Sequence, residues 1–582
     1  MIRINIMKYL AMLMLVVAGC VVAGCESLDD TIGEDPYGGG KEPLGIKLLN
    51  VDPVPASAYP GDTVMFRAQG LLKWCDPKAG NYQFKMYLGG EEAKIVNATD
   101  STMFVKVPQN LSSGITYIVL ENQVFYGPTF TVIGNLTVDE NYGLYTDQDQ
   151  FTGIIRDYVQ SRAQGKANNF YLAGELSHRM GNNSCLGLGL VNERGTLANS
   201  MTNGFRTEQC LTNSASSLVS SQYLNTIAAF DDGKMIVGGE CEAYYTSVPN
   251  DYKDLTGGYQ AVINNMTMIT NEAQLDTVQL NFNETLNENG KYTPIPVARF
   301  NGGFTQPVLR LFVTKAANAD KQQVIAVGNI TQYVTTQYAS SFSDNREAYT
   351  SVANVARLNR DGSLDLSYRN VSSGKYKGAA GGTVTDACQD EEGGVILVGS
   401  FTSFDGVKAN GMVRLDKDGN VDRSFAQNLG TGFNGSVTKI RYNADVKKAA
   451  VVGSFTKANG YDTQSIALVG VNGTVDKAFR PRVFEGGRPT FASVVSQQSD
   501  KVIVAGSFSR YDGVYRRGFL VLDMDGKATQ EFNVPGQFSG ELYQVVETET
   551  TIGGYGLLLL GDITKFNGLD VNNAVMLEAD FR

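Results

Sequence analysis

The chain has 582 residues, too many for one ordinary hydrophobic core, so several domains or an array of repeats are expected. It holds 64 glycines and only 19% charged residues, which favours many short strands and tight turns over long charged helices. The net charge of −11 disfavours nucleic acid and anionic lipid as partners of its body. A single histidine, His178, leaves little room for histidine-based triads or zinc sites.

Residues 1–24 have the features of a secretory leader, since Arg3 and Lys8 precede an apolar run and small residues then lead to a cysteine. This ending resembles the bacterial lipobox, whose cysteine is acylated, and it occurs at both Cys20 and Cys25. Cys25 is favoured because the acidic "CESLDD" resembles the export signal of Bacteroidota surface lipoproteins. The resemblance implies a lipid anchor at Cys25 in the outer membrane, facing the cell exterior, with a flexible tether over 25–44. The alternative is a plain secreted protein.

Five further cysteines follow Cys25, and none of them has C-x-x-C spacing. Neither a zinc site nor a disulfide-dense scaffold is therefore predicted. Because the number is odd, at least one thiol is free or pairs between chains.

Apolar and polar residues alternate from 45 to 133, in stretches such as "TVMFRAQG" and "ITYIVLEN" separated by proline and glycine turns. This pattern predicts a β-sandwich of immunoglobulin type. Pro60-Gly61-Asp62 and Gly127-Pro128-x-Phe130-x-Val132 resemble the opening and the last strand of the IPT/TIG family. That resemblance implies a spacer or interaction module and no particular activity.

From 134 to 582 one phrase recurs, as in "ILVGSFTSFDG" (396–406) and "VIVAGSFSRYDG" (502–513). The later copies repeat every 53 to 55 residues, and each contains apolar strands and Asn-Gly or Asp-Gly turns. Such a period predicts four-stranded blades and a β-propeller of seven blades, giving an all-β chain. A marker glycine in each copy is expected to let the neighbouring sheet approach closely. The marker glycines are Gly174, Gly239, Gly328, Gly399, Gly453, Gly506 and Gly561.

"NGMVRLDKDGNVDRSF" (410–425) resembles the delta-sixty β-propeller repeat. An acidic-flanked lipid cysteine, an IPT-like domain and such a propeller together resemble accessory lipoproteins of SusC/SusD-type importers in Bacteroidota. The resemblance implies a non-enzymatic binding role without a cofactor, and attachment to the membrane through the lipid alone. It also implies the SusC/SusD complex and other surface lipoproteins as partners, and oligopeptide or glycan as ligand. The alternatives are a propeller-fold polysaccharide lyase or glycosidase, which the scarcity of histidine disfavours, and a structural spacer.

One stretch invites a calcium interpretation, because Asp416, Asp418, Asn420 and Asp422 alternate as in a calcium-binding loop. The glycine of such a loop stands sixth, whereas Gly419 stands fourth. In the other repeats the carboxylates vary while the turn remains, so a hairpin turn is predicted here and no metal site.

Two blades are longer than the rest, with 89 residues between Gly239 and Gly328 and 71 between Gly328 and Gly399. Both insertions follow the marker strand, so both are expected on one face of the ring. They are rich in tyrosine, which is common at recognition surfaces, and loop packing is the alternative role. The predicted ligand or partner site consists of Tyr244, Tyr245, Tyr252, Tyr259, Tyr333, Tyr338, Phe342 and Tyr349.

The last copy of the repeat ends at "NNAVMLEADFR", which corresponds to the third strand of a blade. An uncovered sheet edge invites aggregation. The segment "LTVDENYGLY" (136–145), which precedes the first copy, is therefore predicted to supply the missing fourth strand.

Overall fold

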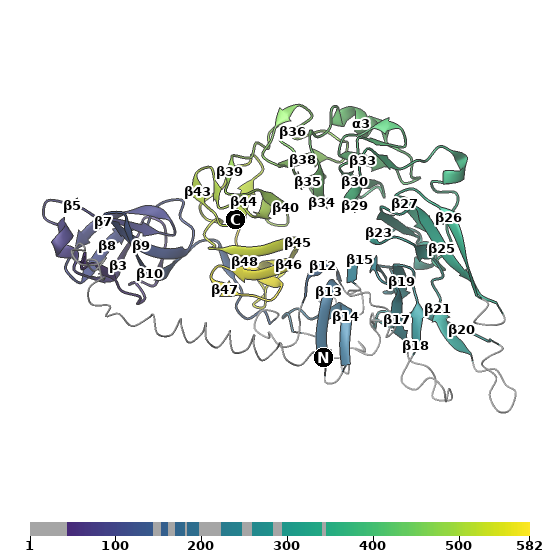
Figure 1. Ribbon diagram of the computed structural model, residues 1–582, viewed down its shortest axis with the longest axis horizontal. Coiled ribbons are helices and arrows are strands. Elements are labelled where there is room, and N and C mark those ends of the chain that lie inside the picture. The colour runs from purple at the N-terminus through teal and green to yellow at the C-terminus, as the bar shows by residue number, and fades with distance from the viewer. Residues whose placement is uncertain are drawn as a thin grey trace, which may run out of the picture.

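A computed structural model describes residues 43–143, 153–160, 169–180, 183–196, 223–246, 259–282, 294–339 and 345–581. The chain forms a small N-terminal sandwich beside a ring of sheets that is seen nearly down its axis (Figure 1). The predicted leader, Cys25 and nearly all of the tether lie outside the described residues. The described part is almost entirely β, with one α-helix, α3 (Arg423–Leu429), and none of its helices is long and apolar enough to span a membrane.

The sandwich has the strand order β1-β3-β8-β7-β6-β9-β10-β2. Alternate residues are buried, as in β3, because one face of each strand packs on the core. Phe66 of β3 and Phe130 of β10 lie with their ring centroids 6.1 Å apart, so the sheet folds over on itself. The strands are β1 (Lys47–Leu48), β2 (Ser57–Ala58), β3 (Thr63–Gln69), β6 (Lys85–Leu88), β7 (Glu91–Ala98), β8 (Thr102–Lys106), β9 (Gly114–Leu120) and β10 (Gln123–Val132).

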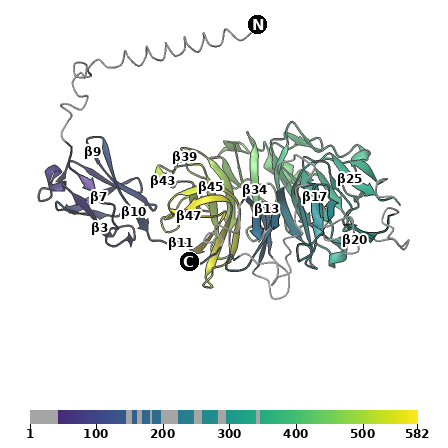
Figure 2. The same cartoon turned by 60° about the horizontal axis from the view of Figure 1, so that its bottom comes forward.

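The sandwich packs against the side of the ring, away from the axis (Figure 2). Ser112 and Ser113 donate their hydroxyls to the carbonyls of Asn533 and Val534, both at 2.9 Å. Arg517 donates to the Gly89 carbonyl at 2.7 Å. Buried hydrogen bonds therefore hold the two parts together.

Seven of the sheets described between residues 155 and 579 are arranged around the ring, each with three antiparallel strands that follow one another in chain order, and we number them blades 1 to 7. Smaller hairpin sheets are inserted between some of these strands. Blade 1 is β12 (Ile155–Gln160), β13 (Phe170–Met180) and β14 (Asn183–Val191), and blade 2 is β15 (Tyr223–Ala229), β16 (Met235–Glu240) and β19 (Met266–Ile269). Blade 3 is β23 (Val308–Val313), β24 (Val324–Gly328) and β27 (Val355–Leu358), and blade 4 is β29 (Val384–Gln389), β30 (Val395–Gly399) and β33 (Met412–Leu415). Blade 5 is β34 (Val437–Asn443), β35 (Lys448–Gly453) and β38 (Ile466–Gly470), and blade 6 is β40 (Pro489–Val495), β41 (Lys501–Gly506) and β44 (Phe519–Asp523). Blade 7 is β45 (Phe538–Glu549), β46 (Tyr555–Phe566) and β48 (Ala574–Ala579).

The expected fourth strand is reduced in five of these blades to a single bridge after the third strand, such as Leu415 with Val421. In the last blade the fourth strand is complete, and it comes from the N-terminal end of the propeller segment. β11 (Leu136–Val138) pairs with β48, with Leu136 opposite Ala579. The predicted closure of the ring is thus observed, although the strand is shorter than the segment 136–145.

Each marker glycine lies on the second strand of its blade, opposite a β-bulge in the first strand. In blade 4, Val384 pairs with Gly399 and Asp386 with Val398, so Thr385 is the extra residue of the bulge. A Cβ on Gly399 would lie 2.0 Å from the carbonyl oxygen of Thr383. The expected close approach therefore comes from a strand of the same blade, not from the neighbouring sheet. The bulged residues of blades 1 to 7 are Arg156, Asn225, Leu309, Thr385, Thr438, Thr490 and Tyr543.

The two turns of the repeat differ in conformation. Asp405 and Gly406 both have positive φ, 48° and 76°, as the predicted two-residue hairpin requires. At the second turn only the glycine, Gly419, has positive φ. There the Asp416 carboxylate accepts hydrogen bonds from the backbone of Asp418 and Asn420, at 3.0 and 2.8 Å, so it stabilises the turn.

Candidate functional site

The two long insertions form hairpins that follow the second strands of blades 2 and 3. They are β17 (Ala243–Thr246) with β18 (Tyr259–Val262), and β25 (Gln332–Gln337) with β26 (Arg346–Ser351). Another hairpin, β20 (Thr277–Leu280) with β21 (Ile295–Ala298), lies next to β18 at the outer edge of the ring (Figures 1 and 2). Of the predicted site, Tyr252 and Phe342 lie outside the described residues, as do the side chains of Tyr245 and Tyr259.

Two of the predicted site residues are buried in the ring. The Tyr244 hydroxyl donates to the Ala273 carbonyl, and burial raises the pKa of this tyrosine. The Tyr333 hydroxyl donates to the Gly362 carbonyl at 2.8 Å. As both rings are at most 4% exposed, they pack in the core and offer no contact surface. For Tyr244 and Tyr333 the expectation of an exposed aromatic patch is corrected.

A cavity of about 190 Å³ lies where the three hairpins meet, and we call it the hairpin cavity. Its apolar wall comes from Ala261 and Val262 of β18 and Val297 and Ala298 of β21, and its polar side includes Arg346 and Glu347 of β26. Tyr338 lines this cavity and packs against Phe282, with ring centroids 6.3 Å apart. Tyr349 lies on β26, is 53% exposed and donates its hydroxyl to Glu347.

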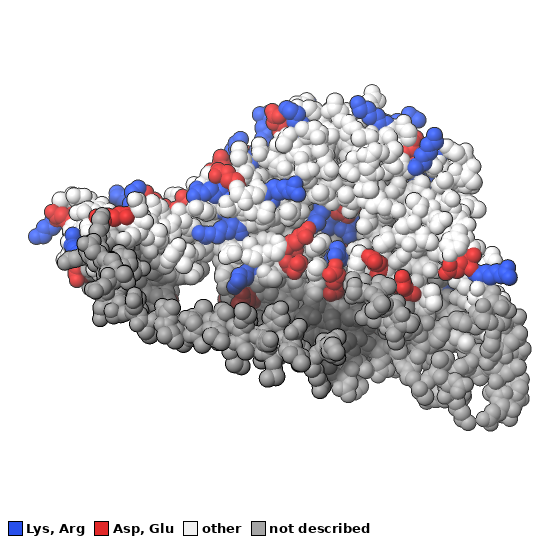
Figure 3. All heavy atoms as spheres, viewed as in Figure 1, with Lys and Arg blue, Asp and Glu red and all other residues white. Residues whose placement is uncertain are grey.

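A second cavity, of about 200 Å³, lies on the axis of the ring, and we call it the central cavity. Six of the seven bulged residues line it, because each bulge turns its extra residue away from the strand ladder. Lysine, arginine and acidic side chains gather over the centre of the ring (Figure 3). The wall contains Arg156, Arg310, Asp386, Lys439 and Glu541.

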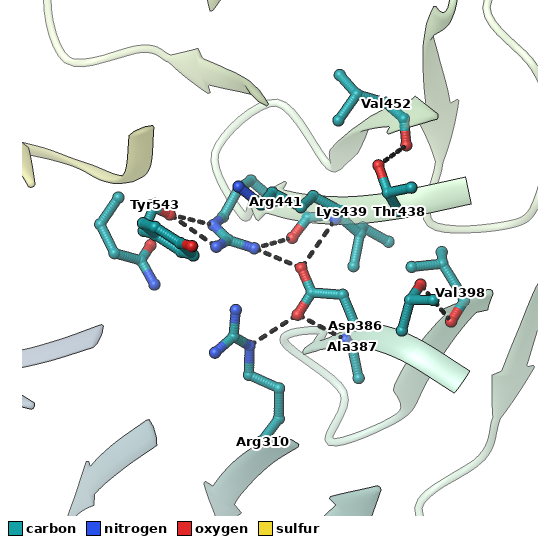
Figure 4. Close-up of polar contacts among 12 residues, drawn as sticks. Arg310, Asp386, Ala387, Val398, Thr438, Lys439, Arg441, Val452 and Tyr543 are labelled. Carbon is teal, nitrogen blue, oxygen red and sulfur yellow. Dashed lines mark hydrogen bonds and ion pairs between the residues drawn. The ribbon is translucent and has the colours of Figure 1, made fainter. Parts of the chain in front are cut away.

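Asp386 lies at the middle of a charged network (Figure 4). Its Oδ1 accepts from Arg310 Nε of blade 3, and its Oδ2 from Arg441 Nη1 of blade 5, both at 2.7 Å. Burial alone would raise the pKa of Asp386, but the two guanidinium groups lower it below its ordinary value. Asp386 is therefore an anion near neutral pH, and it joins three blades.

Blades 5 and 7 are linked across the axis. Lys439 Nζ donates to a carboxylate oxygen of Glu541, and to the Leu542 carbonyl at 3.2 Å. It also lies 4.2 Å from the centroid of the Tyr543 ring. Burial lowers the pKa of Lys439, and the Glu541 carboxylate only partly opposes this effect. Burial and the Glu541 charge raise the pKa of Tyr543 to about 12.

Arg156 of blade 1 completes this wall. Its guanidinium lies 5.0 Å from the Tyr223 ring and 5.5 Å from the Tyr543 ring, and it pairs with Glu175. Its Nε is buried without a hydrogen-bond partner among the described residues. The nearby Asp157 carboxyl has its pKa raised by burial, although Arg310 opposes this effect.

The sequence prediction did not include the central cavity. A usable signal exists, because "VLRLFV", "VTDACQ" and "VTKIRYN" each place a charge inside an otherwise apolar or β-prone first strand. Such a charge is costly unless it is paired. Within the part of the chain that the structure describes, no three His, Cys, Asp or Glu side chains are grouped to hold a metal ion.

Two families match parts of the chain. Residues 21–128 match the family described as "Domain of unknown function (DUF5008)". Residues 338–368, 393–425 and 497–528 match the family described as "Domain of unknown function (DUF5122) beta-propeller". The second match falls on blades 3, 4 and 6 and includes the segment 410–425, so a family comparison supports the propeller. No curated protein matches the chain in sequence.

The chain is distantly similar to several solved structures. The WD40 beta propeller domain of Doa1 is 11% identical, with a TM-score of 0.35, over 76% of this chain and 97% of that one. An auxiliary nutrient binding protein from Bacteroides thetaiotaomicron is 11% identical, with a TM-score of 0.20, over 70% and 94%. One from Bacteroides ovatus is 12% identical, with a TM-score of 0.18, over 71% and 95%.

Proposed function

We propose that the protein is a surface lipoprotein, anchored through Cys25 in the outer membrane and facing the cell exterior. In this proposal it serves a SusC/SusD-type importer as a non-enzymatic accessory that binds an oligopeptide or glycan. The lipobox-like "VAGCESLDD" supports the anchor, and the lipid attaches the protein while the body stays in water. The sandwich then acts as a spacer, since it packs firmly against blade 6.

The observation that carries the binding role is the hairpin cavity. Two insertions that are separate in sequence meet there, each with one tyrosine packed in the core and its outer strand on the cavity. Apolar residues on one side and Arg346 and Glu347 on the other give the mixed lining that is typical of ligand sites. Of the predicted contact residues, Tyr338 lines this cavity and Tyr349 is exposed on β26. The remaining predictions are Tyr245, Tyr252, Tyr259 and Phe342.

A propeller lyase or glycosidase would use the central cavity, where Lys439, Tyr543 and Glu541 lie together. The electrostatics disfavour it. Tyr543 has a pKa of about 12, so it is a poor base near neutral pH. Asp386 has a lowered pKa and is held by two arginines, so it is a poor general acid.

The test replaces the insertion that forms β17–β18, and separately the one that forms β25–β26, with the short loop "TSFDGVKAN" (402–410) of blade 4. Binding to the importer, to peptides and to glycans is measured for the parent protein and for both grafted proteins. We expect at least one interaction to be lost while thermal unfolding still shows a folded ring. If each grafted protein folds and keeps every interaction, the hairpin cavity is not the binding surface.

A further inference from the structure

The charged side chains that line the central cavity have more hydrogen-bond donors than the described part of the protein itself uses. Their carboxylate acceptors, in contrast, are all occupied. Asp386 Oδ1 accepts from Arg310 and from the Ala387 amide at 3.0 Å, and Oδ2 accepts from Arg441 and from the Ile440 amide at 3.1 Å.

Glu541 is occupied in the same way. One of its carboxylate oxygens accepts from Lys439 and the other from the Tyr543 hydroxyl at 3.2 Å. The two carboxylates that line the cavity are therefore each held by donors of the protein itself.

The donors, in contrast, are not all used. A guanidinium has five N–H groups and an ammonium has three. Arg310 donates through Nε and Nη1, and its Nη2 has no partner among the described residues. Lys439 makes two hydrogen bonds, which leaves one N–H, and the buried Arg156 Nε has none within the described chain. Figure 4 shows the two terminal nitrogens of Arg310 on the side away from Asp386.

We propose that the central cavity binds the carboxylate of a small ligand, with Arg156, Arg310 and Lys439 as donors. Cationic donors to a carboxylate make hydrogen bonds about twice as strong as neutral ones. The cavity holds about 200 Å³, so it accepts the acidic end of a ligand and not a long polymer. The Tyr543 ring and Leu309 give this end an apolar wall. The site is separate from the hairpin cavity and does not depend on the function proposed for it.

Two kinds of small ligand carry such a carboxylate, an acidic sugar and a short peptide with a free C-terminus. Titration calorimetry on the folded full-length protein distinguishes them. Glucuronate is compared with glucose, and N-acetyl-alanyl-alanine with its C-terminal amide. We expect an acid of at least one pair to bind and its neutral counterpart not to bind. If only one acid binds, it identifies the class of ligand as sugar or peptide. If both bind, the site recognises the carboxylate and not the rest of the ligand.

Three variants connect binding to the cavity. Lys439→Gln and Arg156→Gln each remove a cationic donor, and each should weaken binding of the acid by about tenfold or more. Lys565→Gln removes an exposed lysine that pairs with Asp570 at 2.6 Å and does not line the central cavity, so this variant should bind like the parent protein. Thermal unfolding of each variant confirms the fold, and the protein with the grafted β17–β18 loop should keep its affinity for the acid.

The proposal is overturned if neither acid binds, or if each neutral counterpart binds as well as its acid. It is also overturned if folded Lys439→Gln and Arg156→Gln proteins both keep the parent affinity. Loss of acid binding in the loop-grafted protein would place the site at the hairpin cavity, and would equally reject the central one.

Discussion

Asp386 and Arg441 lie on the first strands of neighbouring blades, with Oδ2 and Nη1 2.7 Å apart at the centre of the ring. Arg310 holds the other carboxylate oxygen from the blade on the opposite side, also at 2.7 Å. One buried carboxylate therefore fastens blades 3, 4 and 5 together.

Asp386→Asn should lower the free energy of unfolding by about 3–5 kcal/mol, because two buried guanidinium groups lose their shared counter-charge. Urea denaturation followed by tryptophan and tyrosine fluorescence measures the loss. Asp570→Asn, which removes an exposed partner of Lys565, is the matched control and should change little. Equal effects of both variants would mean that the network does not stabilise the ring.

The same carboxylate predicts a dependence on pH. Since its pKa is lower in the folded protein than its ordinary value of 3.8, its contribution is complete above that value and is lost as the pH falls through the folded pKa. The difference in stability between the parent and Asp386→Asn proteins should therefore be constant near neutrality and shrink below about pH 4. Denaturation midpoints from pH 3 to pH 7 measure it. A difference that grows on acidification would reverse the assigned sign.

Gly399→Ala should destabilise blade 4 by about 1–3 kcal/mol, because the new Cβ would lie 2.0 Å from the Thr383 carbonyl oxygen. Gly554→Ala is the control, since its Cβ would meet nothing nearer than 3.4 Å. Thermal unfolding of both proteins compares them. If the two variants are equally stable, the bulge does not explain the marker glycine.

A chain that starts at residue 150 lacks β11 and should be less stable and more prone to aggregate than one that starts at 134. The longer chain keeps Leu136 paired with Ala579, and Asp139 as the acceptor for the Thr551 amide at 2.8 Å. Light scattering and thermal unfolding measure both properties. Both chains lack the sandwich, so the comparison isolates the closing strand, and equal stability would contradict its role.

Cys25→Ala should abolish labelling of the protein by a radioactive fatty acid, whereas Cys20→Ala should keep it. The acylated protein on intact cells should be cleaved by added protease. Labelling that survives in Cys25→Ala but not in Cys20→Ala would move the anchor to Cys20.

The propeller could be predicted because its evidence is local: the glycine, the turns and the apolar strands recur within each copy of the repeat. The pairing of β11 with β48 could also be predicted, since a blade that lacks a strand must find one. Whether each tyrosine of the insertions is buried or exposed could not be predicted from such local patterns. Tyr244 and Tyr333 have the same sequence surroundings as exposed tyrosines, and only the distant carbonyls of Ala273 and Gly362 reveal that they are buried.

The central cavity could not be predicted from local sequence patterns either, because its residues come from distant parts of the chain. Arg156 and Tyr543 are nearly four hundred residues apart, and closure of the ring alone brings them together. A bulge shifts the alternation of inward and outward residues by one position, and in a short first strand such as β29 that shift is too brief to be recognised in a single sequence.

In an ordinary strand each residue both pairs with the neighbouring strand and presents its side chain, so a change of side chain can disturb the pairing. The bulge separates these two roles. Its extra residue makes no ladder pair, so it can change without disturbing the hydrogen bonds between strands, while the glycine opposite keeps room for it. Such positions recur in all seven described blades, and six of them face one cavity. In related propellers the side chains that line the central cavity could therefore change one blade at a time, while the strands and their hydrogen bonds stay the same. Within any set of such sequences, variability should concentrate at the bulged residue, which stands directly before Asp386 in blade 4 and directly before Arg310 in blade 3.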